Sequence, residues 1–419
     1  MSLNVNNQAM LLLSMRFSQD SRGEPTSLTP TEYGRFSRWL HENTYEPKDL
    51  FSRFGAVSQG WNDPKGKITT DRLEHLLGRG AAMGLALESW ASAGIWILTR
   101  ADPDYPERLK RKLREVAPPV LLGVGDQRLL NVGGLAIVGS RNVDPSDQAY
   151  AQQVAQSAAR SGMNVVSGGA RGVDETAMLA ALEVDGTATG VLANGLLSAA
   201  LSGKWRLYVK KKDLCLVSTN SPEAPFQVGH AMGRNKYIYC LADYALIVRS
   251  EKGEGGTWAG ATEALKKNLA PVFVRPDSDA PGNAALIHMG STPLPAPPAD
   301  SEESGAWLTH ALTTPVDSQS SGQGGELAPP SPSSPFPLEG PDLFYSSFAK
   351  QLEDVFSAKP EVTLQDLKIR HPDLTAEQIT YWLGRAVEAD LIERRGRSHR
   401  YTLKAESRAQ QSLFDSEES

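Results

Sequence analysis

The pattern of apolar and polar residues changes along the chain and predicts three structured parts. Up to about residue 130 the segments look helical, and Thr29 followed by Pro30 has the form of a helix start, with an N-cap residue before proline in the first turn. From Leu135 short apolar runs alternate with helical stretches. Helical periodicity returns after the 340s. We therefore expect a helical N-terminal module, an α/β core and a small C-terminal domain.

The short apolar runs of the core have the length of buried strands. Turn residues follow them and helical stretches separate them. The predicted strands are residues 135–138, 163–166, 190–193, 214–217, 246–249 and 272–274, and residues 118–122 are expected to form an edge strand. Strands that alternate with helices predict a doubly wound, mostly parallel, Rossmann-like sheet.

Composition and periodicity divide the rest of the chain. Proline, serine, glycine and acidic residues dominate from 291 to 342, which is typical of a flexible linker. Residues 343–404 have three helical stretches and a hairpin pattern at 392–403, which favours a winged-helix-like domain. The tail is expected to be disordered. The predicted domains are residues 1–100, 101–290, 291–342, 343–404 and 405–419.

Charge and composition narrow the class of protein. No apolar run approaches the roughly 18 residues that cross a bilayer, and the N-terminus lacks signal-peptide features, so we expect a cytoplasmic protein without a membrane segment. Cys215 and Cys240 are too few for a disulfide framework or a thiolate zinc site. Nothing predicts a catalytic residue, a metal or a cofactor. Because the net charge is −6, affinity for nucleic acid must come from local basic patches.

Two glycine-rich loops carry the candidate chemistry. Each follows a predicted strand and precedes a helix, which places backbone N–H groups and the positive end of a helix dipole at the carboxyl edge of the sheet. An anion is expected to bind there. The loop residues are Gly139, Ser140 and Arg141 in the first loop, and Ser167, Gly168, Gly169, Arg171 and Gly172 in the second. The alternative is that these glycines only turn the chain and that Asp174 only caps a helix.

The two loops resemble the paired signatures of the DprA/Smf family of single-stranded DNA binders. The likeness extends to residues 102–106, 118–123, 233–238, 255–261 and 281–287, in the expected order. It implies a Rossmann-like core, a C-terminal winged-helix-like domain and a homodimer. It also implies single-stranded DNA as the partner, with loading of a RecA-type recombinase or DNA uptake as the role.

The resemblance further implies which residues contact DNA. Arg141, Arg171, Arg234 and Lys236 would contact phosphates, and Phe226 would stack on a base of an unpaired strand. The spacing from Phe226 to Arg234 is longer than in the family, so a core position is the alternative for Phe226. The other positions carried over are Asn235, Gly255, Gly256 and Thr257.

The C-terminal domain and tail add further candidate contacts. In a winged helix, Arg385 would lie on the recognition helix, and a basic wing would contact duplex DNA; protein binding is the alternative. The wing residues are Arg394, Arg395, Arg397 and Arg400. In the tail, Gln410, Leu413 and Phe414 resemble the anchors of a peptide that docks on the replication sliding clamp. The alternative is that Leu413 and Phe414 pack on the wing.

Two other functions stay open. A DprA-like chain could serve phage defence, or it could be the DNA-binding antitoxin of a cognate toxin. A nucleotide-binding or N-glycosidic-bond-hydrolysing enzyme similar to the LOG family is the third possibility. Residues 255–257 and Glu263 superficially resemble the loop of that family, but no single register satisfies both the glycines and the glutamate. The sequence therefore favours a non-enzymatic DNA-binding protein.

Overall fold

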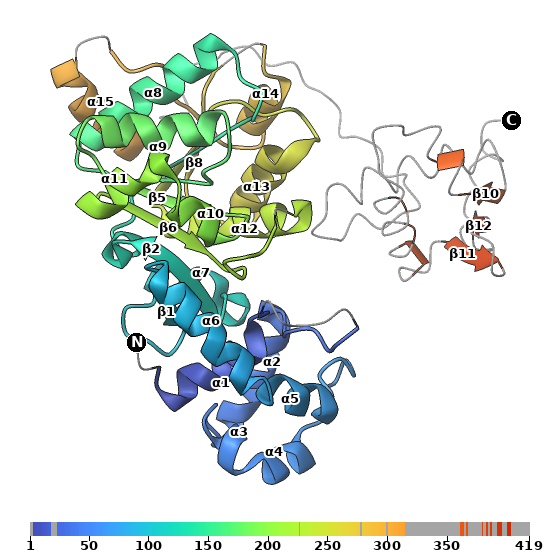
Figure 1. The fold of residues 1–419 in the computed structure, drawn as a ribbon. Coiled ribbons are helices and arrows are strands. Elements are labelled where there is room, and N and C mark those ends of the chain that lie inside the picture. The colour runs from blue at the N-terminus through green and yellow to red at the C-terminus, as the bar shows by residue number, and fades with distance from the viewer. Residues whose placement is uncertain are drawn as a thin grey trace, which may run out of the picture. The chain divides into compact units, whose positions relative to one another are not determined.

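The computed structural model describes residues 3–17, 23–225, 227–276, 279–298 and 301–314, together with short pieces between 361 and 403 (Figure 1). The chain divides into two compact units, residues 1–317 and 318–419. This division coincides with none of the predicted domain boundaries at residues 100, 290, 342 and 404, which stay predictions.

The first unit begins with six helices. They are α1 (Val5–Ser14), α2 (Pro30–Glu42), α3 (Asp49–Ser52), α4 (Phe54–Gly60), α5 (Thr70–Leu77) and α6 (Gly80–Ser92). The predicted helix start is confirmed, because the Thr29 hydroxyl accepts the Glu32 N–H while the Glu32 carboxylate accepts the Thr29 N–H. Helices α1 to α5 share a core that includes Phe36, Trp61 and Leu73. The N-terminal helices thus have an apolar core of their own.

A nine-stranded sheet forms the centre of this unit. Its strands are β1 (Trp96–Thr99), β2 (Val120–Gly125), β3 (Leu135–Val138), β4 (Val165–Ser167), β5 (Ala188–Val191), β6 (Leu214–Ser218), β7 (Tyr244–Ile247), β8 (Val272–Val274) and β9 (Thr292–Pro293). They lie in the order β1-β2-β6-β5-β4-β3-β7-β8-β9. The pairs β1–β2 and β2–β6 are antiparallel and the others are parallel. The prediction of a mostly parallel, doubly wound sheet is confirmed.

One strand prediction was wrong. Residues 118–122 were expected at the edge of the sheet, but β2 lies inside it because β1 pairs along its outer side. The short run 96–99 directly follows helical sequence, so its pattern alone did not separate it from the helices. The antiparallel β1–β2 pair extends the sheet on the side away from β7.

Helices cover both faces of the sheet (Figure 1). They are α7 (Glu107–Leu113), α8 (Pro145–Arg160), α9 (Val173–Glu183), α10 (Leu196–Ala200), α11 (Gly203–Lys211), α12 (Val228–Leu241), α13 (Gly255–Lys266), α14 (Pro281–His288) and α15 (Ser301–Thr313), with the short 3-10 turns η1 (Arg114–Val116) and η2 (Gln127–Leu130). In β3, Leu135 and Ile137 pack with α8 and α9, whereas Ala136 and Val138 pack with α12 and α13. Burial on both faces explains why the strands are continuous apolar runs.

Helix α15 lies within the segment predicted as a flexible linker. It packs on α8, and its Leu308 and Leu312 are buried. The proline and serine content of residues 291–342 outweighed this short helical spacing in the prediction. The structure therefore differs from the expected linker at residues 301–313.

Of the second unit, the structure describes a three-stranded antiparallel sheet and isolated helical positions. The strands are β10 (Glu361–Thr363), β11 (Ile392–Arg395) and β12 (Arg400–Leu403), in the order β10-β12-β11. Pairing of β11 with β12 confirms the predicted hairpin. Ile379, Leu383 and Ala386 are buried at helical spacing. The winged-helix assignment stays a prediction.

The described parts of the chain contain neither a membrane-spanning helix nor a metal-binding cluster. No helix there is long and apolar enough to cross a membrane. Among the same residues, no group of three or more His, Cys, Asp or Glu side chains is arranged to hold a metal ion. Cys215 in β6 and Cys240 in α12 are buried and form no disulfide, so each fills the sheet core.

A buried ion pair holds the N-terminal helices together. The Asp63 side chain is 2% exposed and accepts hydrogen bonds from Arg35 Nε at 2.7 Å and Arg35 Nη2 at 3.1 Å. The backbone N–H groups of Lys67 and Ile68 also donate to it. Burial acts to raise the pKa of Asp63, but the Arg35 and backbone hydrogen bonds outweigh burial and lower it to about 2.

We expect Asp63→Asn to lower the free energy of unfolding by about 3 kcal/mol at pH 7, because the variant leaves the Arg35 charge without its partner. Folding lowers the pKa of Asp63. The ionised carboxylate therefore stabilises the folded state at any pH above the ordinary pKa of an aspartate, and this stabilisation is lost as pH falls towards 2. The difference between wild type and variant therefore narrows in acid. Urea unfolding followed by tryptophan fluorescence at pH 7 and pH 3 measures it.

Asp71→Asn is the matched control, because Asp71 is exposed in the first turn of α5. It should cost less than about 1 kcal/mol, the size of a helix-dipole effect. Equal losses in the two variants, or a loss at Asp63 that does not change with pH, would contradict the role of this pair.

Candidate nucleic-acid interface

The carboxyl ends of the parallel strands form one edge of the sheet, and the strand order reverses there. From β3 the chain moves outward through β4, β5 and β6, and then returns through α12 to β7 on the other side of β3. The loops after β3 and β7 therefore lead away from each other and leave a crevice. Ligands of doubly wound folds bind at such a position.

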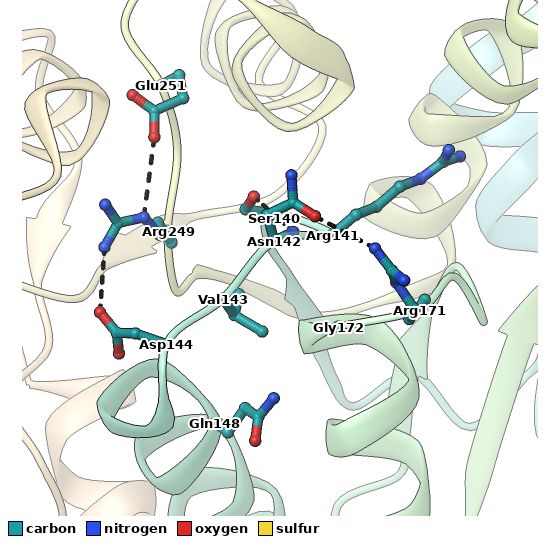
Figure 2. Close-up of a pocket in the computed structure, with 10 residues that line it drawn as sticks. All are labelled: Ser140, Arg141, Asn142, Val143, Asp144, Gln148, Arg171, Gly172, Arg249 and Glu251. Carbon is teal, nitrogen blue, oxygen red and sulfur yellow. Dashed lines mark hydrogen bonds and ion pairs between the residues drawn. The ribbon is translucent and has the colours of Figure 1, made fainter.

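A cavity of about 760 Å³ lies at this crevice (Figure 2), and we call it the large cavity. The loops after β3, β4 and β7 and the start of α8 line it. The lining residues are Ser140, Arg141, Asn142, Val143, Asp144, Gln148, Arg171, Gly172, Arg249 and Glu251. A second, small cavity of about 330 Å³ is lined by Arg141, Gly168, Gly169, Ala170, Arg171, Ala193, Asn194 and Arg234. Arg141 and Arg171 line both cavities.

The structure thus brings most of the predicted loop residues together. Arg171 Nη2 donates to Asn142 Oδ1 at 3.2 Å, which joins the second glycine loop to the first. Ser167 and Gly139 lie behind the cavity lining. Ser167 is buried and its hydroxyl donates to the Ile137 carbonyl at 2.6 Å. These two residues support the loops, and Ser140, Arg141 and Arg171 face the cavities.

The backbone amides of the glycine loops have an internal partner. Gly139 N–H donates to Asp174 Oδ1 at 3.4 Å, and the nearby backbone N–H groups of Gly168 and Ala170 act to lower the pKa of this carboxylate. Asp174 is only 8% exposed, in the first turn of α9. An internal carboxylate therefore occupies the helix N-terminus where the sequence predicts an external anion. Contacts to a bound phosphate are left mainly to side chains.

Arg234 supplies the opposite charge beneath the loops. Its side chain comes from α12, is 5% exposed and donates through Nη1 to the Val191 carbonyl. Burial raises the pKa of Asp174 to about 6, although the Arg234 charge opposes that shift. Burial also lowers the pKa of Arg234. Arg234 lines the small cavity from within and exposes little surface to a phosphate.

The predicted residues of α12 and α13 lie elsewhere. Lys236 lies over the Tyr237 ring at 5.3 Å, and burial lowers its pKa. Asn235 Nδ2 donates to the Gly256 carbonyl at 3.0 Å, which joins α12 to the first turn of α13. None of Asn235, Lys236, Gly255, Gly256 and Thr257 lines either cavity.

Glu263, the residue considered for the enzyme alternative, forms an ion pair with Lys267 at 2.7 Å on α13. It is not among the residues that line the two cavities. The described site gives no support to a hydrolase centre at this carboxylate.

Other predicted positions lie outside the described residues. They are Phe226, Arg385, Arg397, Gln410, Leu413 and Phe414. Arg394 and Arg395 lie in β11 and Arg400 lies in β12, where Arg395 pairs in register with Arg400. Arg394 and Arg400 are exposed. A basic hairpin is therefore present, and its contact with DNA stays a prediction.

The sequence prediction missed the wall of the large cavity formed by Asp144, Gln148, Arg249 and Glu251. Asp144 had a local signal, because it forms a capping box with Asp147 at the start of α8. Arg249 had one as well, since it is the last residue of a predicted strand. What the sequence did not give is the order of the strands, which sets β7 beside β3.

Comparison with known proteins agrees with this fold. The family model described as "DNA recombination-mediator protein A" matches residues 96–297. Residues 96–297 form a DprA/Smf domain. This DprA/Smf domain contains the whole sheet and every residue that lines the two cavities.

Individual relatives of the DprA/Smf domain cover different shares of the chain. The chain is 29% identical over 212 residues to DNA processing protein DprA of Bacillus subtilis, covering 49% of this chain and 70% of that protein. It is 31% identical over 205 residues to Protein Smf of Synechocystis, covering 46% of this chain and half of that protein. The X-ray structure of DprA from Streptococcus pneumoniae superposes with a TM-score of 0.56 at 19% identity, over 75% of this chain and all of that one, which shows a shared fold.

The second glycine loop leaves no room for a side chain at Gly168. A Cβ there would overlap Arg234 Nη1 and Asp174 Oδ2. We expect Gly168→Ala to lower the free energy of unfolding by about 2 kcal/mol, because the added Cβ displaces two buried charged side chains, Arg234 and Asp174. Thermal and urea unfolding of the full chain measure this loss.

Gly233→Ala is the control for this variant. Gly233 lies in α12 next to Arg234, and a Cβ there meets open space. Because alanine is the better helix former, this variant should be as stable as the wild type or more stable by up to about 1 kcal/mol. If both variants unfolded like the wild type, the close packing of Gly168 against Arg234 and Asp174 would be contradicted.

Proposed function

We propose that this chain is a non-enzymatic protein that binds single-stranded DNA at the cavities of its DprA/Smf domain. The observation that carries the proposal is the meeting of Arg141 and Arg171. They come from different loops, are both exposed, and line both cavities. Guanidinium groups bind phosphate through paired hydrogen bonds, so two of them at one edge fit a phosphodiester chain.

The charge of the chain makes this local pair important. With a net charge of −6, the protein as a whole does not attract a polyanion. Arg171 is held towards the first loop by Asn142, at 3.2 Å, so its position depends on the folded loops. Binding should therefore be local, dependent on the fold and sensitive to salt.

A cavity, in contrast to a flat basic surface, favours an unpaired strand. The large cavity, of about 760 Å³, lies within the size range of pockets that enclose small ligands, and a nucleotide can enter it only when its base is not paired. The matched family is described as a recombination mediator. We extend this role to the chain, with the bound strand passed to a RecA-type recombinase by a homodimer.

Duplex DNA, the sliding clamp and a cognate toxin are the other partners that the sequence suggests. Duplex DNA is assigned to the basic hairpin of β11 and β12. The contact with the sliding clamp would be made by tail residues that lie outside the described ranges. No particular residue is assigned to a cognate toxin. Recombination is therefore the role that we favour over phage defence.

We expect the double variant Arg141→Ala/Arg171→Ala to bind a single-stranded oligonucleotide at least about tenfold more weakly than the wild type, because it loses two charge-assisted phosphate contacts. The plot of log K against log salt should become shallower by about 1.4, or about 0.7 for each lost phosphate contact. Fluorescence anisotropy at several salt concentrations measures both values.

Arg128→Ala is the matched control, because Arg128 is also exposed but pairs with Asp126, outside both cavities. It should leave affinity and salt slope close to those of the wild type. If the double variant also behaves like the wild type, the site assignment is wrong.

A further inference from the structure

The large cavity has two walls of different charge (Figure 2). Arg141 and Arg171 form one wall. Facing them, Arg249 shares its single charge with three carboxylates, at 3.4 Å from Asp147, 3.6 Å from Asp144 and 3.8 Å from Glu251. Phosphate is therefore attracted to the Arg141 and Arg171 wall, whereas the Arg249 wall has no excess positive charge for it.

Asp147 fixes the position of Arg249. Its side chain is fully buried and also pairs with Arg275 at 2.6 Å. Asp144 accepts the Asp147 N–H at 2.8 Å, and its hydrogen bonds to this and neighbouring groups lower the pKa of Asp144. Asp147 is thus used entirely within the protein and orients this wall, whereas the Asp144 side chain is 51% exposed.

Glu251, on the loop after β7, is the second exposed carboxylate of this wall. Its Oε1 lies 3.8 Å from Arg249 Nε, which is too long for a hydrogen bond, and its side chain is 54% exposed. A carboxylate accepts hydrogen bonds and donates none. Gln148, on the first turns of α8, lies in the same cavity, and Val143 adds an apolar contact between the walls. Glu251 therefore presents a charged acceptor next to an apolar surface.

We propose that this wall is a base subsite that selects bases carrying an amino group. The inference rests on the proposed function: a nucleotide whose phosphate contacts Arg141 and Arg171 places its base against Val143 and Glu251. Cytosine, adenine and guanine each offer an amino donor to the carboxylate. Thymine has a carbonyl oxygen where cytosine has its amino group, and two acceptors repel each other.

Cytosine and thymine give the sharpest comparison, because they are alike in size and differ in this group. We expect the full chain to bind a fluorescein-labelled dC 12-mer about fivefold more tightly than a dT 12-mer at the same salt concentration, since a hydrogen bond to a charged acceptor is stronger than a neutral one. In Glu251→Gln the ratio should fall below about twofold, because an amide both donates and accepts.

Glu254→Gln is the matched control. Glu254 is exposed, precedes α13 and lies outside the residues that line the cavity, so this variant makes the same charge change three positions away. It should keep the fivefold ratio. A ratio near one in the wild type, or the same ratio in both variants, overturns the base subsite while single-strand binding stands. If the wild type binds neither oligonucleotide, the proposed function fails, and the subsite fails with it.

Discussion

The site depends on the buried carboxylate of Asp174, which lies at the amides of the glycine loops, where the sequence predicts a bound anion. Asp174 accepts the Gly139 N–H, lies close to the backbone N–H groups of Gly168 and Ala170, and is balanced by the charge of Arg234, which is itself almost completely buried. Two glycine loops that would otherwise leave several N–H groups without partners are in this way joined at one point. Because the loops are held from inside, their own side chains Arg141 and Arg171 are positioned on the edge of the sheet.

The order of the strands explains why the two walls of the large cavity differ in charge. The reversal of strand order at β3 brings the β7 loop beside the first glycine loop, so Arg249 and Glu251 face the two arginines. The fully buried Asp147 then fixes Arg249 between carboxylates. One fold feature, the position of β7, therefore supplies both the space for a nucleotide and the charge difference across it.

The sequence predicts the helices and strands of the core better than it predicts which of them lie side by side. Residues 135–138 and 272–274 were predicted as strands with the bounds found in the structure, because both faces of each are buried and the apolar run is unbroken. Local signals also identified Thr29 and the two glycine loops. Strand β1 and helix α15 were missed, because their short apolar patterns lie within a helical segment and a proline-rich segment.

The candidate site shows the same limit. Arg141 and Arg171 were predicted from their loops, but Arg249 and Glu251 follow a strand whose partner is known only from the fold. The sequence also did not reveal that Asp174 occupies the loop amides, since helix capping and phosphate binding use the same residues. Burial of Arg234 and Lys236 likewise results from the packing of α12, which periodicity does not specify.

The central claim is that an unpaired strand binds at the edge of the sheet where the loops after β3, β4 and β7 meet. The most direct measurement is the affinity of the full chain for one oligonucleotide as a single strand and as a duplex, by fluorescence anisotropy across a series of salt concentrations. We expect tighter binding of the single strand, with an affinity that falls steeply as salt increases. Tighter binding of the duplex, or no binding of either form, would contradict it.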